Sequence, residues 1–201
     1  HLVEQAKSGR EVKLHFRVFD DGVAFRYELL EQSGRDSIFI LEEISEFNFA
    51  QDGQSWWIQG GYAFDTYEQL HQKSLLSAID SANTPLTFVT DDDLFVSIHE
   101  ANLTNYAGMT LKKAVTDSLR FRSYLVPWPD GDKVKTALPM QSPWRTITIG
   151  HKATDLLGSR MILNLNEPGQ ISDPSWIKPM KYVGIWWGMH LNKYTWVQGE
   201  K

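Results

Sequence analysis

A histidine and a glutamate lie next to each other where a strand-like run breaks into a polar turn. The run "FVSIHEANLTNYAGM", residues 95–109, reaches His99 and Glu100 and continues through Asn102, Asn105 and Tyr106. Calcium prefers carboxylate oxygens, so Glu100 is a candidate cation ligand at a strand end. Successive strand residues point to opposite faces, so His99 and Glu100 serve one pocket only if the strand twists or ends there. The alternative for Glu100 is a solvated position on the rim of a sheet.

The other polar clusters have simpler explanations. Three aspartates at residues 91–93 lack the spaced oxygen ligands, the central Gly and the closing Glu of an EF-hand, and they stand where a hairpin needs a turn. Asn166 and Glu167 precede Pro168-Gly169 and are typical of a turn or cap. No nucleophile elbow, phosphate loop or HExxH motif occurs, and no carboxylate pair is marked for glycoside hydrolysis.

The composition narrows the classes of protein. The 201 residues include 42% hydrophobic residues and a formal net charge of −5, which argues against a nucleic-acid partner. No run approaches the roughly 18 apolar residues of a membrane span. Eight Trp, seven Tyr and ten Phe suit a large β-core and also sugar binding. Without cysteine there is no disulfide or thiolate chemistry. The lack of cysteine fits a bacterial periplasmic protein and also a cytosolic one. Our expectation is a periplasmic or secreted bacterial protein, with any export signal removed or upstream.

Alternation of apolar and polar residues dominates the first 165 residues. Residues 11–30 predict a hairpin around Asp20-Asp21-Gly22, and residues 84–103 predict a second hairpin. A single helical turn is expected near residues 153–158. Many short strands at this spacing indicate an all-β fold, a large antiparallel β-sandwich over residues 1–168. Further strands are predicted at residues 37–41, 55–59, 110–116, 118–126, 145–150 and 160–164.

The character of the sequence changes after residue 165. Residues 169–181 are predicted to be a linker. The run 182–187 is almost continuously apolar, as expected of a parallel strand that is covered on both faces. We therefore expect residues 182–201 to begin a second, truncated domain. Of the neighbours Trp186 and Trp187, one ring would point into a barrel and line a substrate pocket there.

Three segments together resemble glycoside hydrolase family 97, the α-glucosidases and α-galactosidases. They are "FRVFDDGVAFRYEL" at 16–29, "VSIHEANLTNYAGM" at 96–109 and "PWRTITIG…DLLGSRMILNLNEP" from 143 to 168. The segment "SWIKPMKYVGIWWGMH" at 175–190 resembles the start of the catalytic barrel of that family. The resemblance implies a large N-terminal sandwich, here without its first strands, followed by the first strand of a truncated (β/α)₈ barrel.

The resemblance also implies functional residues. Glu100 would be a ligand of a Ca²⁺ ion at the mouth of the barrel, with the remaining ligands and the catalytic carboxylates outside this chain. Asn102, Trp186, Trp187 and His190 would form the active-site wall. The implied activity is exo-acting hydrolysis of terminal α-linked glucose or galactose, with the fragment inactive alone. The partners would be the α-linked substrate and the rest of the catalytic barrel.

Two other functions fit parts of the sequence. A stand-alone carbohydrate-binding module would end near residue 170 and expose an aromatic platform. A purely structural sandwich would leave Glu100 solvated and without a partner. The residues do not distinguish glucosides from galactosides, or a retaining from an inverting course. The candidates for an aromatic platform are Trp56, Trp57, Tyr62 and Trp128.

Overall fold

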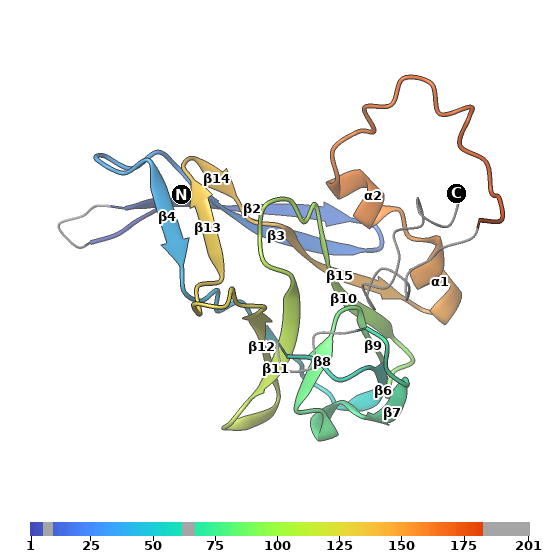
Figure 1. The fold of residues 1–201 in the computed structure, drawn as a ribbon. Helices are drawn as coiled ribbons and strands as arrows, with labels where there is room; N and C mark the ends of the chain where they lie inside the picture. Colours follow the sequence, from blue (N-terminus) through green and yellow to red (C-terminus); the bar gives the residue numbers. More distant parts are fainter. Residues whose placement is uncertain (6–9, 62–66, 183–201) are drawn as a thin grey trace, which may run out of the picture. The chain divides into compact units, whose positions relative to one another are not determined.

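The computed structural model describes residues 1–5, 10–61 and 67–182, and these residues form mostly antiparallel β-structure (Figure 1). The chain divides into two compact units, residues 1–167 and residues 168–201. All the named strands and helices belong to the first unit. The expected all-β, antiparallel fold is confirmed for that unit. The expected barrel strand at 182–187 lies almost entirely outside the described residues.

The larger sheet is built on the two predicted hairpins. Strand β2 (Glu11–Phe19) pairs with β3 (Gly22–Leu29) through a turn at Asp20-Asp21. Strand β9 (Leu86–Thr90) pairs with β10 (Phe95–Ala101) through the turn that begins the Asp91–Asp93 run. A Cβ atom at Gly22 would lie 2.3 Å from the carbonyl oxygen of Ile147, so the close approach of β15 (Trp144–Gly150) requires glycine there. The sheet has the order β1 (Leu2–Val3), β2 (Glu11–Phe19), β3 (Gly22–Leu29), β15 (Trp144–Gly150), β10 (Phe95–Ala101), β9 (Leu86–Thr90), β6 (Gly53–Trp57) and β7 (Gln72–Leu75), with β14 (Met140–Gln141) beside β3.

A second sheet of four strands packs on part of the larger one. Its order is β5 (Glu46–Asn48), β12 (Asp117–Leu125), β11 (Met109–Ala114) and β8 (Ser81–Asn83). A separate pair joins β13 (Val134–Ala137) to β4 (Ser37–Ile40), and a 3₁₀ turn spans Leu76–Ala78. The sheets enclose a continuous apolar core. Fully buried members from both sheets include Leu86, Phe88, Ile98, Leu111 and Phe121.

Two short helices follow β15. Helix α1 (Ala153–Gly158) is the predicted helical turn, while α2 (Met161–Leu165) occupies the segment predicted as a strand at 160–164. That strand prediction is wrong. A short apolar run does not reveal its period, and here Met161 and Leu165, spaced four apart, are the buried pair, packed with Ala101 and Trp144. No helix of the described residues is long and apolar enough to cross a membrane.

The smaller sheet leaves part of the larger one uncovered. Phe16 pairs with Phe25 in register, and Phe25 contacts Phe47 of β5, so Phe16 faces the same side as the four-stranded sheet. Phe16 is nevertheless 62% exposed, and Val18 on the same face is 80% exposed. In the part of the chain that the structure describes, no strand pairs with the outer edge of β5. Beside β5, the sandwich is therefore open.

Candidate functional site

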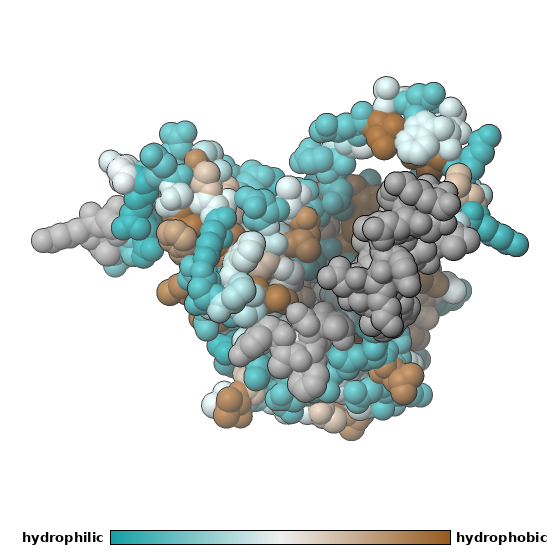
Figure 2. All heavy atoms as spheres, viewed as in Figure 1, coloured by the Kyte–Doolittle hydropathy of each residue, from teal (hydrophilic) through white to brown (hydrophobic). Residues whose placement is uncertain are grey.

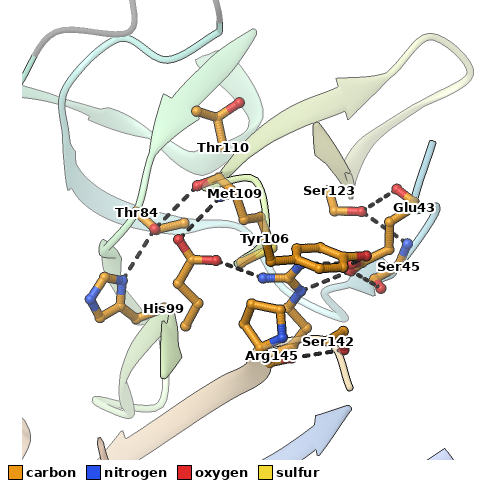
Figure 3. Close-up of polar contacts among 12 residues, drawn as sticks. Glu43, Ser45, Thr84, His99, Tyr106, Met109, Thr110, Ser123, Ser142 and Arg145 are labelled. Atoms are coloured by element: carbon orange, nitrogen blue, oxygen red, sulfur yellow. Dashed lines mark hydrogen bonds and ion pairs between the residues drawn. The ribbon is translucent and has the colours of Figure 1, made fainter. Parts of the chain in front are cut away.

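A buried arginine organises the polar centre of the sandwich (Figure 3). Arg145 follows Trp144 on β15, opposite Glu100 of β10, and its side chain is completely buried. Its Nε and Nη2 donate to the two carboxylate oxygens of Glu43 at 2.8 and 2.6 Å. Its Nη1 donates to Oε2 of Glu100 at 2.6 Å. One guanidinium thus joins two carboxylates from distant parts of the sequence, with the bidentate geometry that favours Arg at buried ion pairs.

Hydroxyl groups supply further hydrogen bonds to the Glu43 carboxylate. The Ser45 hydroxyl donates to Oε1 of Glu43 at 2.8 Å, and the Tyr106 hydroxyl donates to Oε2 at 2.9 Å. The hydroxyls of Tyr27 and Ser45 lie 3.0 Å apart, which extends the network to β3. The Arg145 guanidinium carbon lies 5.6 Å from the centre of the Tyr106 ring, within cation–π distance. A buried charge needs such partners, because an unpaired one is costly.

Glu100 uses both carboxylate oxygens inside the domain. Oε2 accepts from Arg145, and Oε1 accepts from the backbone N–H of Met109 at 3.1 Å. The residue is 9% exposed. Met109 begins β11 of the smaller sheet, so Glu100 links the two sheets. This placement rules out the solvated rim position that the sequence left open.

The environment moves the pKa values of this cluster in different directions. Burial raises the pKa of the Glu100 carboxyl, against the opposing effect of Arg145. Burial also acts to raise the pKa of Glu43, but its hydrogen bonds and charge pairing with Arg145 outweigh this and leave that pKa below its usual range. Burial and the neighbouring Glu43 raise the pKa of Tyr106. The pairing with Arg145 thus dominates at Glu43, whereas burial dominates at Glu100.

The described residues around Glu100 do not by themselves form a calcium site. The position beside Oε2 is taken by a guanidinium, which is itself a cation held by two carboxylates. Among the described residues, no group of three His, Cys, Asp or Glu side chains could hold a metal ion. A cation on Glu100 would need the guanidinium to withdraw and other ligands to come from outside these residues. The ligand role of Glu100 stays a prediction.

The other predicted site residues lie apart from one another. His99 points to the opposite side of β10 from Glu100, and its Nδ1 lies 3.1 Å from the Thr84 hydroxyl; burial lowers its pKa. The backbone N–H of Asn102 donates to Oδ1 of Asn166 at 2.9 Å, which ties the end of β10 to the end of α2. Trp186, Trp187 and His190 lie outside the described residues.

Sequence reasoning missed the centre of this site. Glu43 lies in an irregular segment without the alternating pattern of a strand, and nothing adjacent to Arg145 in "PWRTITIG" distinguishes it from an exposed polar residue. One signal was present in the strand pattern. Arg145 occupies an alternating strand with Ile147 and Ile149, so a charged residue on their face of β15 indicates a buried pair.

The described residues of the first unit thus define a two-sheet antiparallel β-sandwich with a buried charge cluster at its centre. A sequence model of the glycosyl-hydrolase 97 N-terminal domain matches residues 1–168. The chain therefore belongs to glycoside hydrolase family 97, and its sandwich is the N-terminal domain of that family.

Solved structures support this assignment. A family 97 enzyme from Pseudoalteromonas sp. strain K8 is 43% identical with a TM-score of 0.79, and the match covers 92% of this chain and 28% of that one. It has been solved in complex with acarbose and with panose. A β-arabinopyranosidase structure is 27% identical with a TM-score of 0.61, over 72% of this chain and 26% of its own.

Curated relatives are longer than this chain. A retaining α-galactosidase from Bacteroides thetaiotaomicron is 24% identical over 208 residues, covering 89% of this chain and 31% of the relative. A probable retaining α-galactosidase from Streptomyces bingchenggensis is 26% identical over 187 residues, and the match covers 89% of this chain and 26% of the relative. The chain thus spans about a third or less of the relatives that it matches.

Proposed function

We propose that these residues are the sandwich portion of an exo-acting α-glycosidase that removes terminal α-linked glucose or galactose. The observation that carries the proposal is the 43% identity to an enzyme solved with acarbose and panose, which are α-linked oligosaccharides. The catalytic acid, base or nucleophile would lie outside these residues, in a (β/α)₈ barrel that begins near residue 182. The sandwich would form one wall of the active site, and the enzyme would be periplasmic or secreted.

The substrate has two candidates, each with its own support. The curated relatives are α-galactosidases of the retaining kind, whereas panose is a glucose oligosaccharide bound by the 43% identical enzyme. A retaining course needs the two catalytic carboxyl groups to be about 5–5.5 Å apart. The higher identity favours α-glucosides as the first substrates to try.

Calcium belongs to the proposal as a cofactor of the whole enzyme. A divalent cation near the active site would supply positive charge that stabilises clustered carboxylates. What the present residues do is hold Glu100 in a paired, buried state with Arg145 and Met109. Glu100 would join a calcium site only after exchanging the guanidinium for the metal.

The first experiment uses the full-length protein, with Glu100→Gln as the variant and Glu42→Gln, an exposed neighbour of Glu43, as the control. Hydrolysis of nitrophenyl α-glucoside and α-galactoside is followed, and calcium binding is measured by calorimetry. The proposed activity predicts turnover of one of these substrates by the wild type. Failure to hydrolyse either would reject it.

Calcium binding separates two roles for Glu100. If Glu100 is a ligand, Glu100→Gln weakens calcium binding by about tenfold or more and activity falls with it, as for loss of a metal ligand or its support. If Glu100 is only a member of the buried cluster, calcium affinity stays unchanged while the thermal unfolding midpoint falls. Glu42→Gln should change neither quantity.

A further inference from the structure

We propose that the pocket beside Trp128 is a sugar-binding subsite for α-linked hexose oligosaccharides. The class of sugar follows from the proposed glycosidase function, on which this inference rests. The location of the site follows from the geometry of the pocket alone. Neither the comparisons nor the buried charge cluster assigns a role to Trp128.

The pocket is formed by three segments that meet at one end of the smaller sheet. Its volume is about 320 Å³, within the range of small-molecule sites. One wall is the turn that follows Glu100, another is the loop after β12, and the third is the start of β13. The lining residues are Asn105, Tyr106, Ala107, Gly108, Val126, Pro127, Trp128, Lys133, Val134 and Lys135.

Trp128 is held in place although much of its surface is exposed. Its backbone N–H donates to the carbonyl of Asp132 at 2.7 Å, and its carbonyl accepts from Gly131 at 2.9 Å, in a turn where Gly131 has φ +97°. The indole is nevertheless 57% exposed. An exposed indole on a fixed backbone is a common anchor of binding sites, because a Trp side chain offers a large contact area and has only two rotatable bonds to immobilise when a ligand stacks on it.

Other exposed tryptophans lack these features. Trp56 is 38% exposed on β6 and lines neither the pocket beside Trp128 nor the cavity beside β5. Trp176 is 67% exposed in the segment after α2. Among the described residues, Trp128 alone of these three combines an exposed ring with a walled pocket, which makes it the place where a pyranose could stack and be enclosed on its sides.

The polar groups suit a neutral ligand with many hydroxyls. The Lys135 ammonium lies 6.0 Å from the Trp128 ring centre and forms ion pairs with Asp130 and, at 3.5 Å, Asp132. Its charge is thus neutralised locally, and the ammonium of the other lining lysine, Lys133, lies 5.4 Å from the centre of the Tyr124 ring. Asn105, whose Nδ2 donates to the Thr136 hydroxyl at 3.2 Å, offers its amide oxygen as an acceptor for a sugar hydroxyl.

The pocket is also coupled to the rigid centre of the domain. Tyr106 lines the pocket and donates its hydroxyl to Glu43 in the buried cluster. The carbonyl of Gly108 accepts from the N–H of Val126, which joins two walls. The pocket walls are therefore fixed before a ligand arrives, as preorganised binding requires.

The test compares full-length wild type with Trp128→Ala, Trp128→Phe and the matched control Trp56→Ala. Native gel electrophoresis measures how strongly each variant is retained by a polysaccharide in the gel. Soluble starch presents α-glucan, and galactomannan presents α-galactose branches. Hydrolysis of nitrophenyl α-glucoside and α-galactoside is measured in parallel, because these small substrates occupy the catalytic centre only. Thermal unfolding verifies that each variant is folded.

We expect Trp128→Ala to weaken retention on one of the two polysaccharides about tenfold, with Trp128→Phe retaining most of it and Trp56→Ala unchanged. Hydrolysis of the nitrophenyl substrates should stay within twofold. Unchanged retention in Trp128→Ala overturns the subsite, as does equal loss in Trp56→Ala. A parallel loss of small-substrate hydrolysis also overturns it, because the effect of Trp128 would then not depend on an oligosaccharide. Retention on the polysaccharides does not depend on turnover. If the protein hydrolyses neither nitrophenyl substrate, the proposed function is rejected, but the retention of the variants can still be compared.

Discussion

At the scale of single residues, the decisive feature is one guanidinium between two carboxylates. Arg145 is fully buried and carries one positive charge, while Glu43 and Glu100 together carry two negative charges when ionised. Transferring such ions from water is costly, and removal of one partner leaves an uncompensated charge. The hydroxyls of Ser45 and Tyr106 and the Met109 N–H reduce that cost. The cluster therefore holds Glu100 in a defined position between the two sheets.

The lowered pKa of Glu43 predicts a pH dependence of stability. A carboxyl whose pKa is lower in the folded protein contributes stability above its unfolded pKa of about 4.3, and that contribution is lost as the pH falls through the folded value. We expect Glu43→Gln to lose about 3–5 kcal/mol of unfolding free energy at pH 7. The difference from wild type should narrow below about pH 4.

Urea unfolding at several pH values measures this effect, with Glu42→Gln as the exposed neighbour for comparison. A difference between Glu43→Gln and wild type that stays constant from pH 7 to pH 3 would contradict the ion-pair explanation. Loss of the same size in Glu42→Gln would point to a general charge effect instead.

At the scale of elements, the turn after β10 connects the charge cluster with the neighbouring segments. Asn102 and Asn105 adopt left-handed backbone conformations, with φ of 55° and 49°. Asn tolerates this region better than other residues with a side chain. The two asparagines let the chain leave β10, place Tyr106 over Arg145 and return as β11. The polar composition of this turn thus has a conformational cause.

Substitutions at Asn102 test this explanation with a matched pair. Asn102→Gly should keep wild-type stability within about 0.5 kcal/mol, because glycine adopts positive φ readily. Asn102→Val should lose about 1–2 kcal/mol, since a β-branched side chain is strained there. Both variants keep the backbone N–H that donates to Asn166. Thermal unfolding distinguishes them, and equal stability of the two would show that backbone strain does not matter at this position.

At the scale of the whole molecule, the open side of the sandwich exposes apolar side chains beside a cavity. A cavity of about 590 Å³ lies between β5 and the larger sheet, and Phe16 and Val18 are exposed beside it. Figure 2 shows one face of the molecule, on which hydrophilic side chains predominate among scattered hydrophobic ones. Apolar surface next to an unpaired strand edge is typical of a site that another strand covers. We propose that further strands of the full-length enzyme lie here. The apolar residues that line the cavity are Phe25, Phe47, Phe49, Phe88, Leu94, Val96, Ile147 and Ile149.

Thiol labelling in the full-length enzyme tests this proposal, because the 201 residues contain no cysteine of their own. Val18→Cys should react with a maleimide at least tenfold more slowly than Val115→Cys, which lies in the fully exposed turn between β11 and β12. Peptide mapping assigns each label to its site. Equal labelling rates would mean that the face stays open. Protection that depends on protein concentration would indicate a second copy of the protein as the cover.

The sequence by itself determined the two hairpins, several further strands and the family resemblance. Alternation over residues 11–30 and 84–103 marked the paired strands of the larger sheet, because side-chain period and burial are local properties. The pattern also separated His99 from Glu100 onto opposite faces. The family resemblance came from motifs that need no knowledge of contacts.

Only the tertiary structure decided which polar residues meet. Glu43 and Arg145 are 102 positions apart, and no local pattern links an irregular segment to a late strand. The helical period of residues 161–165 emerged only from packing of Met161 and Leu165 on Trp144. The same holds for Trp128, whose pocket forms where three distant segments converge. Long-range pairing depends on how the sheets stack, and that information lies in the whole fold rather than in any short stretch of sequence.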